Sequence, residues 1–317
     1  MSPLELGFLR LSSGLRLRFR CLGDDGPTVL LLHGWPQTGH AWRRVMPTLA
    51  ASGYRVVVPD GRGAGDSDQP TEGYDAQTRM EDVRDLVSVL GLGDAPVFAV
   101  GHGEGADVAA AYAAAHPQEI AGLATLSAGP GVTPAGWHGG FHQTPDLPEL
   151  LLAPHLEAYL RHFFRAWSHD PDMLPEQDLA VYVRALSQPG ALRASLAPFR
   201  ASQSPVSVSD STVPRLLLLG ESDPRLSASD LGRSTAQEAG ERRAEAARIE
   251  IIPRGGYWLP EERPDPVAAA LLTFFREPTR LAEARYPPEA GGAAGKVVGG
   301  SDLSSSAFLG QSDQRPV

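Results

Sequence analysis

The stretch PVFAVGHGEG, residues 96–105, joins an apolar run to a glycine-rich turn. An apolar run over 96–100 is typical of a strand that other elements cover on both faces of a sheet. The alanine-rich segment that follows, 105–116, predicts a helix. A strand that leads through a tight turn into a helix is the repeating unit of a parallel α/β sheet. This stretch therefore predicts an α/β fold.

The same alternation continues on both sides of this stretch. The pattern predicts further strands at 15–22, 28–33, 54–59, 120–127, 215–219 and 248–252, and further helices at 77–90 and 265–276. Strands that are joined by helices of this length need right-handed crossovers. We therefore expect a mostly parallel central sheet that is flanked by helices.

The pattern changes after residue 129. Residues 130–205 are rich in His, Pro, Trp and Tyr and show helical spacing without strong strands, which predicts an inserted helical cap. The core is then expected in two parts, 1–129 and 206–285. Residues 286–317 are rich in Gly, Ala and Ser and carry too little apolar content to order themselves, so we expect a disordered tail.

Composition narrows the class of protein. The chain has 317 residues, 42% of them hydrophobic, and a net charge of −10 without a basic run, which argues against a nucleic-acid partner. No run approaches the roughly 18 apolar residues of a membrane span, and the first residues lack a signal-peptide pattern, so we expect a cytoplasmic protein with no membrane partner. Cys21 is the single cysteine, and we expect neither a metal nor a cofactor.

Four loops carry a resemblance to a known family. They are His33-Gly34-Trp35-Pro36-Gln37-Thr38, residues 60–67, residues 101–105 and Gly220-Glu221-Ser222-Asp223-Pro224. In this order they resemble the α/β-hydrolase fold superfamily, and within it the epoxide hydrolase and haloalkane dehalogenase branch, over about residues 8–280. The resemblance implies that residues 101–105 form the nucleophile elbow, a sharp turn that exposes a Ser or Asp side chain.

The residues on which hydrolysis in this branch depends differ here. Gly103 stands at the nucleophile position and has no side chain to attack a substrate. Tyr257 stands where the resemblance places the general-base histidine, and all nine histidines precede residue 170. Phe199 takes the place of a tyrosine that polarises the epoxide oxygen. Asp223 matches the acid that normally orients the histidine, and it either holds Tyr257 or forms a structural Asp-Pro turn.

The oxyanion site is expected to survive, because the resemblance builds it from backbone N–H groups, here those of Trp35 and Glu104. One such donor is typically worth about 10²–10³ in rate. The Glu104 carboxylate is a candidate base if an apolar pocket raises its pKa, and otherwise a residue favoured at the start of a helix by the helix dipole. The candidate catalytic residues are therefore Glu104, Trp35 and Asp223.

We expect a binding pocket between the sheet and the cap. The candidate residues that would bind substrate there are His33, Trp35, His102, Gly103, Trp137, His155, Tyr159 and Tyr257. His155, Tyr159 and His162 share a face at helical spacing, although an amphipathic cap helix with polar residues in water would show the same spacing.

Three functions remain open. The first is a non-hydrolytic isomerase that removes a proton next to a carbonyl, with the enolate held by the oxyanion site and with a substrate carboxylate as one choice of base. The degenerate elbow and the missing histidine are similar to peptide epimerases of bottromycin biosynthesis, which implies a modified-peptide substrate. The alternatives are a pseudohydrolase that only binds a small molecule or peptide, and residual hydrolysis of an epoxide or ester by water, with Asp223 or Glu104 as base.

Overall fold

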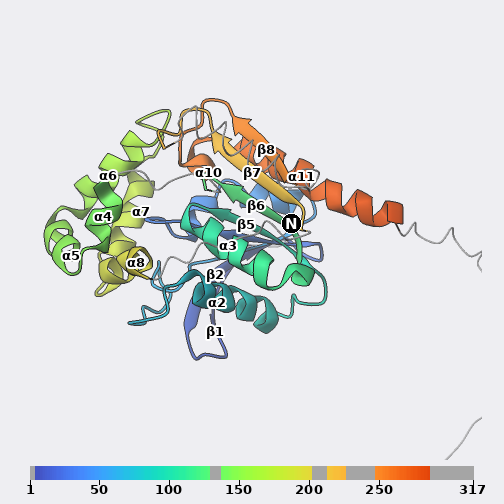
Figure 1. Cartoon of the computed structure of the whole chain (residues 1–317), viewed down its shortest axis with the longest axis horizontal. Coiled ribbons are helices and arrows are strands. Elements are labelled where there is room, and N and C mark those ends of the chain that lie inside the picture. Colours follow the sequence, from blue (N-terminus) through green and yellow to red (C-terminus); the bar gives the residue numbers. More distant parts are fainter. Residues whose placement is uncertain (1–3, 129–136, 202–212, 226–246, 286–317) are drawn as a thin grey trace, which may run out of the picture.

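The computed structural model describes residues 4–128, 137–201, 213–225 and 247–285. An eight-stranded sheet runs through them in the order β1-β2-β4-β3-β5-β6-β7-β8 (Figure 1). The strands are β1 (Glu5–Arg10), β2 (Arg16–Leu22), β3 (Thr28–Leu32), β4 (Arg55–Pro59), β5 (Val97–His102), β6 (Ile120–Leu126), β7 (Arg215–Gly220) and β8 (Ala247–Ile252). β2 pairs antiparallel with β1 and with β4, and the remaining pairs are parallel. The predicted α/β fold with a mostly parallel central sheet is confirmed.

Helices cover both faces of this sheet. On one face lie α2 (Ala76–Val89) and α3 (Glu104–Ala115), and on the other lie α1 (Met46–Ala51) and α11 (Pro264–Arg285). Three short elements, η1 (Gly39–Trp42), η2 (Pro117–Glu119) and α10 (Leu259–Glu262), complete the core. Asp75 caps the start of α2, because its carboxylate accepts a hydrogen bond from the Thr78 N–H at 2.9 Å.

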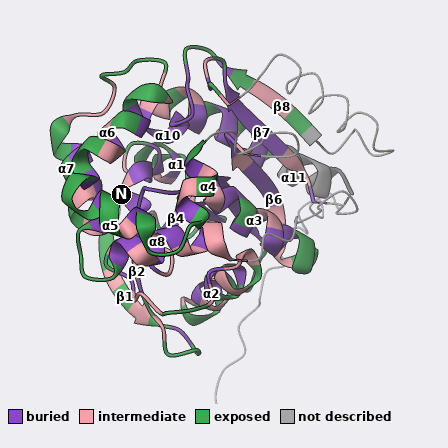
Figure 2. Ribbon diagram, turned by 60° about the vertical axis from the view of Figure 1, so that its left-hand side comes forward, coloured by how far each residue is buried: buried purple, intermediate pink, exposed green. Residues whose placement is uncertain are grey.

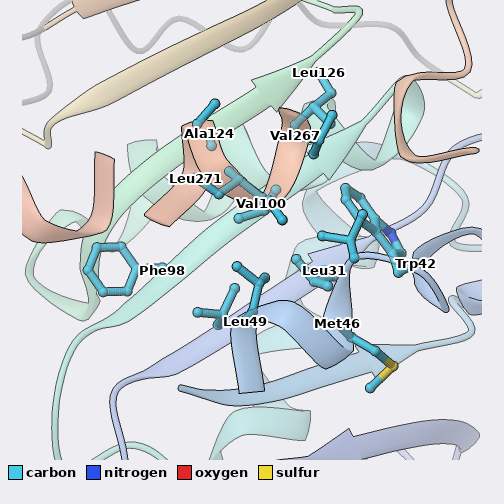
Figure 3. Close-up of a cluster of buried hydrophobic side chains, with 14 of the residues drawn as sticks. Leu31, Trp42, Met46, Leu49, Phe98, Val100, Ala124, Leu126, Val267 and Leu271 are labelled. Atoms are coloured by element: carbon cyan, nitrogen blue, oxygen red, sulfur yellow. The ribbon is translucent and has the colours of Figure 1, made fainter. Parts of the chain in front are cut away.

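The continuous apolar runs of β3 and β5 place side chains in both layers at once. Leu31 and Val100 point into the layer between the sheet and α11, where they pack with Trp42 and Leu271 (Figure 3). Leu30 points to the opposite layer, under α2 and α3. Figure 2 shows the result, with the central strands buried and the outer helix surfaces exposed. This packing fixes the strand ends from which the functional loops project.

β1 is a strand that the sequence analysis does not predict. It lies at the edge of the sheet and pairs only with β2. Its apolar residues Leu6 and Phe8 are more than half exposed, at 56% and 53%. The strand thus forms by backbone pairing rather than by burial, and burial is the signal that a hydrophobic pattern reports.

The segment between β6 and β7 forms a separate layer of helices beside the sheet (Figure 1). They are α4 (Trp137–Gln143), α5 (Leu147–Leu152), η3 (Ala153–His155), α6 (Leu156–Ala166), α7 (Glu176–Leu186) and α8 (Ala191–Arg200). Arg43 of the core joins this layer to α10, since its guanidinium contacts Asp178 at 2.5 Å and Glu261 at 2.6 Å.

Two predictions about organisation fall partly outside the described residues. The expected cap boundaries lie in 129–136 and 202–212, and the expected tail comprises 286–317. Within the described residues, no helix is both long enough and apolar enough to cross a membrane.

Candidate active site

The turn between β5 and α3 has the backbone conformation of a strained elbow. Gly103 has φ 54° and ψ −124°. An L-residue with a side chain is strained at such a φ, whereas glycine is not. The turn is held in place because the Gly103 N–H donates to the Leu126 carbonyl at 3.1 Å. The sequence therefore keeps the tight turn and omits the side chain that it would present.

Tyr257 fills the space that a side chain on Gly103 would need. A β-carbon built on Gly103 would lie inside 3.0 Å of the Tyr257 hydroxyl oxygen. Tyr257 belongs to the loop between β8 and α10, and its own backbone is anchored on both sides. Its N–H donates to the Trp167 carbonyl at 2.7 Å, and its carbonyl accepts from the Ser127 hydroxyl at 2.9 Å.

Asp223 lies close by but is paired with another residue. Its carboxylate accepts from Arg225 Nε at 3.1 Å and from Arg225 Nη2 at 2.9 Å, and the Asp223 side chain is fully buried. The same guanidinium donates to the Ser127 carbonyl and lies 3.8 Å from the centre of the Tyr257 ring. Such a desolvated cation over an aromatic face contributes about 2 kcal/mol. Asp223 thus acts on Tyr257 through Arg225, and it also accepts the Arg225 backbone N–H at 3.0 Å, as in a structural turn.

His102 is a buried neutral residue under the Tyr257 loop. Its Nε2 donates to the Tyr257 carbonyl at 2.8 Å, and its ring packs 4.6 Å from the Tyr257 ring. Burial lowers the pKa of His102 to about 3, because a charged imidazole loses its hydration there. His102 therefore holds the backbone and the ring of Tyr257 in place.

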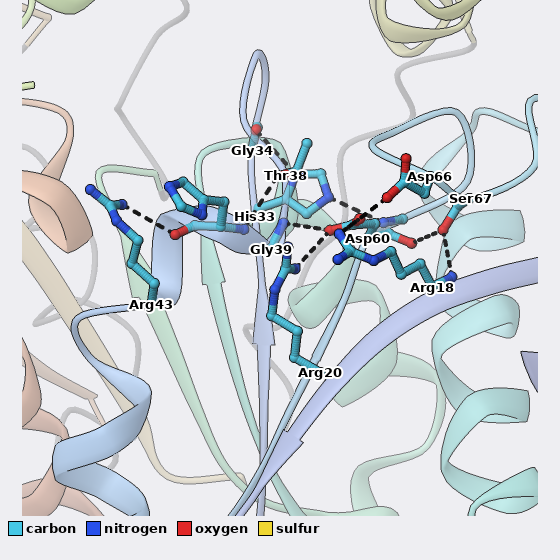
Figure 4. A network of polar contacts seen from close by, with 12 residues as sticks. Arg18, Arg20, His33, Gly34, Thr38, Gly39, Arg43, Asp60, Asp66 and Ser67 are labelled. Carbon is cyan, nitrogen blue, oxygen red and sulfur yellow. Dashed lines mark hydrogen bonds and ion pairs between the residues drawn. The ribbon is translucent and has the colours of Figure 1, made fainter. Parts of the chain in front are cut away.

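His33 lies in a polar network beneath its loop (Figure 4). Its Nε2 accepts from the Gly61 N–H at 3.1 Å, and its Nδ1 is 3.2 Å from the Gly34 carbonyl. Both ring nitrogens are thus engaged with backbone groups. Next to it, the Asp60 carboxylate accepts from the Gly39 N–H at 2.8 Å and from Arg20 at 3.1 Å.

Glu104 is the first residue of α3 and points toward α2. Its Oε2 lies 3.5 Å from Arg79 Nη1, and 22% of its side chain is exposed, yet Oε1 is buried without a hydrogen-bond partner. Burial raises the pKa of Glu104 to about 7, against the opposing charge of Arg79. The raised pKa of Glu104 is consistent with a general base. Its position at the start of a helix is equally consistent with a residue that the helix dipole favours.

Two backbone N–H groups lie in the loops that meet at this turn. Within the part of the chain that the structure describes, neither the Trp35 N–H nor the Glu104 N–H donates to another residue. The two loops touch, since a β-carbon built on Gly34 would lie 3.2 Å from the Glu104 nitrogen. Two unpaired N–H groups at adjoining loops are the arrangement that stabilises an oxyanion.

Aromatic side chains from the cap close over these loops. The Trp35 ring lies 4.6 Å from the His142 ring, 5.5 Å from Phe163 and 5.8 Å from Phe199. Tyr159 joins them, because its hydroxyl is 2.7 Å from His142 Nε2. The Trp35 indole N–H and His142 Nδ1 are buried without partners among the described residues.

Two candidate residues lie at the margin of this group. Trp137 is 62% exposed, although its ring is 6.2 Å from that of Tyr159. His155 is exposed at the start of α6. The structure therefore brings Trp35, Gly103, Glu104, Tyr159 and Tyr257 to one region, with Asp223 and His102 behind them.

Arg225 and His142 are two residues of this region that the sequence analysis did not select. A basic residue two positions after Asp223 is a local signal for the ion pair. His142 had no such signal, because only the folding of α4 against α6 brings it to Tyr159.

Comparison with known proteins gives the same family as the geometry. The family model described as alpha/beta hydrolase fold matches residues 27–245. A soluble epoxide hydrolase of Corynebacterium sp. (strain C12) is 32% identical over 83% of this chain and 94% of its own length. Epoxide hydrolase 3 of Xenopus tropicalis is 30% identical over 86% of this chain and 78% of its own length.

Solved structures agree. The crystal structure of wild-type Cfl2 from Burkholderia cenocepacia has a TM-score of 0.74 and 34% identity, with 87% of this chain and 97% of that chain covered. The structure of epoxide hydrolase CorEH without ligand has a TM-score of 0.74 and 30% identity, with 86% of this chain and 99% of that chain covered. A mostly parallel sheet, an elbow before α3 and a helical layer over the strand ends define an α/β-hydrolase. This chain belongs to the α/β-hydrolase fold family.

Proposed function

We propose that this protein binds a small organic molecule between its sheet and its cap and does not hydrolyse it through a covalent intermediate. One observation carries the proposal: the Tyr257 hydroxyl occupies the place of the side chain that would attack a substrate. Covalent catalysis needs a nucleophile within hydrogen-bond reach of an activating base. Gly103 offers no such atom.

Two further observations support this proposal. Asp223, the acid that would orient a histidine, is paired with Arg225 instead. The relatives are named epoxide hydrolases, so the ligand is expected to be of about the size of an epoxide or its diol. The names of these relatives give no support to the peptide epimerase that the sequence resemblance implied, and they favour the epoxide-directed alternatives.

A second candidate function is residual hydrolysis by water. The observation that favours it is the Glu104 pKa of about 7, which suits a general base at neutral pH. Glu104 would then remove a proton from a water molecule, and the unpaired N–H groups of Trp35 and Glu104 would hold the developing negative oxygen.

Styrene oxide distinguishes these functions. The full-length protein is titrated with styrene oxide by calorimetry, and diol is then measured by chromatography. Saturable binding with the epoxide recovered intact supports the binding function. Diol that forms with the wild-type protein but not with Glu104→Gln would establish residual hydrolysis. Tyr54→Phe, a change in the core beside Phe98 and Phe275, serves as the control.

A further inference from the structure

We infer that the ligand carries a carboxylate, which binds at the amino end of α3 between the Tyr257 hydroxyl and the backbone N–H groups of Trp35 and Glu104. The inference rests on the proposed binding function and names the chemical class of its ligand. It assigns to Tyr257, the residue in the place of the general-base histidine, the role of a hydrogen-bond donor.

The Tyr257 hydroxyl has no acceptor among the described residues. The residue is 5% exposed, and its hydrogen bonds to other described residues come from its backbone N–H and carbonyl. Burial raises its pKa further above the ordinary value of 10, so the hydroxyl keeps its proton. An acceptor on a ligand would give this hydroxyl a hydrogen bond that the described part of the protein does not supply.

The place toward which this hydroxyl points already favours negative charge. α3 is 12 residues long, and its macrodipole puts about half a positive charge at its amino end. The Glu104 N–H belongs to that end, and the Trp35 N–H follows Gly34, on which a β-carbon would lie 3.2 Å from the Glu104 nitrogen. Anions bind readily where such N–H groups converge. A carboxylate has two oxygens with two lone pairs each, enough to accept from all three donors.

The neighbouring charges permit an anion here. Arg225 lies directly behind the Tyr257 ring, and its charge is balanced by buried Asp223. Glu104 is the opposing charge, and its pKa of about 7 means that it is half protonated at neutral pH.

The aromatic rings above the turn specify the rest of the ligand. The Trp35 ring meets the rings of Phe163 and Phe199 edge to face, with ring centres 5.5 Å and 5.8 Å away. Such rings contribute apolar contact area and favourable ring geometry. An aryl or alkyl carboxylic acid therefore fits better than a highly polar acid.

The test compares phenylacetate with phenylacetamide, its neutral counterpart of similar shape. Binding of each to the full-length protein is measured by calorimetry at pH 6.5, for wild type, Tyr257→Phe and the control Tyr159→Phe. We expect the acid to bind about tenfold more tightly than the amide. Tyr257→Phe should weaken the acid about tenfold and the amide much less, and Tyr159→Phe should affect both alike.

Each other outcome has a separate meaning. An amide that binds as tightly as the acid overturns the carboxylate inference and leaves the binding function standing. A carboxylate that does not bind, or whose affinity is unchanged in Tyr257→Phe while the melting temperature matches wild type, also overturns it. Conversion of styrene oxide to diol by the wild-type protein would instead overturn the proposed function itself.

Discussion

The hydroxyl oxygen of Tyr257 lies less than 3.0 Å from the position that a β-carbon on Gly103 would take, which is closer than real β-carbons come to other atoms. The two residues are therefore coupled, because Gly103 leaves a space and Tyr257 fills it. In the proposed function, the residue that the resemblance places at the histidine position therefore blocks the one that it places at the nucleophile position.

This coupling predicts a non-additive pair of substitutions. Gly103→Ala should cost about 1–3 kcal/mol in free energy of unfolding, from backbone strain at φ 54° and from overlap with the hydroxyl. In a Tyr257→Phe background the hydroxyl overlap is gone, so the cost should fall by about 1 kcal/mol. Urea denaturation measures both.

Gly91→Ala is the control for backbone strain. Gly91 has φ 65°, and a β-carbon there would meet no atom within 4 Å. Equal costs of Gly103→Ala in the two backgrounds would show that Tyr257 and Gly103 do not compete for space.

The buried ion pair predicts a second coupling. Arg225→Met should destabilise the protein by about 3–5 kcal/mol, because it leaves the buried Asp223 carboxylate without a partner. Asp223→Asn together with Arg225→Met should recover most of that loss, since no charge is then stranded. Thermal unfolding measures the stability of both variants. If the double variant is no more stable than Arg225→Met alone, the stranded charge of Asp223 is not the cause of the loss.

Glu104 predicts a stability difference that depends on pH. Its pKa is about 7 in the folded protein against 4.5 for an ordinary glutamate, so ionisation disfavours the folded state. The penalty is absent below pH 4.5, grows between pH 4.5 and 7, and is complete above pH 7. Glu104→Gln should therefore be more stable than wild type by about 1–3 kcal/mol at pH 8 and equal to it near pH 4.5.

Urea denaturation across that pH range measures the difference. The charged or titratable groups around Glu104 are Arg79 on α2, Asp107 on α3 and Tyr257. Parallel stability curves for wild type and Glu104→Gln would mean that Glu104 titrates normally.

Restoring the missing groups predicts a gain of hydrolysis. Gly103→Asp supplies a nucleophile, Tyr257→His removes the blocking hydroxyl and supplies a base, and Arg225→Ser frees Asp223 to orient that base. The triple variant should form diol from styrene oxide at least about 10² times faster than Gly103→Asp alone. Comparable rates for these two variants would contradict the role assigned to Tyr257 and Arg225.

Much of the fold could be predicted from the sequence because its central strands are continuous apolar runs. β3, β5 and β7 are buried on both faces, and such burial leaves a pattern that a reader of the sequence can recognise. β1 left no such pattern, because pairing at the edge stabilises it while Leu6 and Phe8 stay exposed.

The site was only partly predictable. Gly103 and Tyr257 could be singled out by their places in two loops, but their overlap depends on how the loop after β8 crosses the elbow. The pairing of Asp223 with Arg225 had a local signal, whereas the contact of His142 with Tyr159 joins α4 to α6 and had none. Contacts between distant segments depend on packing that periodicity does not report.

The most direct test of the central claim, that no covalent intermediate forms, is a single turnover with ¹⁸O-labelled water. Excess wild-type protein is incubated with styrene oxide in H₂¹⁸O, and any diol is analysed by mass spectrometry. We predict bound, intact styrene oxide and no diol above the protein-free control. Diol that carries ¹⁶O at the newly formed hydroxyl would show transfer from a carboxylate of the protein and would contradict the account, and diol that carries ¹⁸O would show direct attack by water and replace binding with residual hydrolysis.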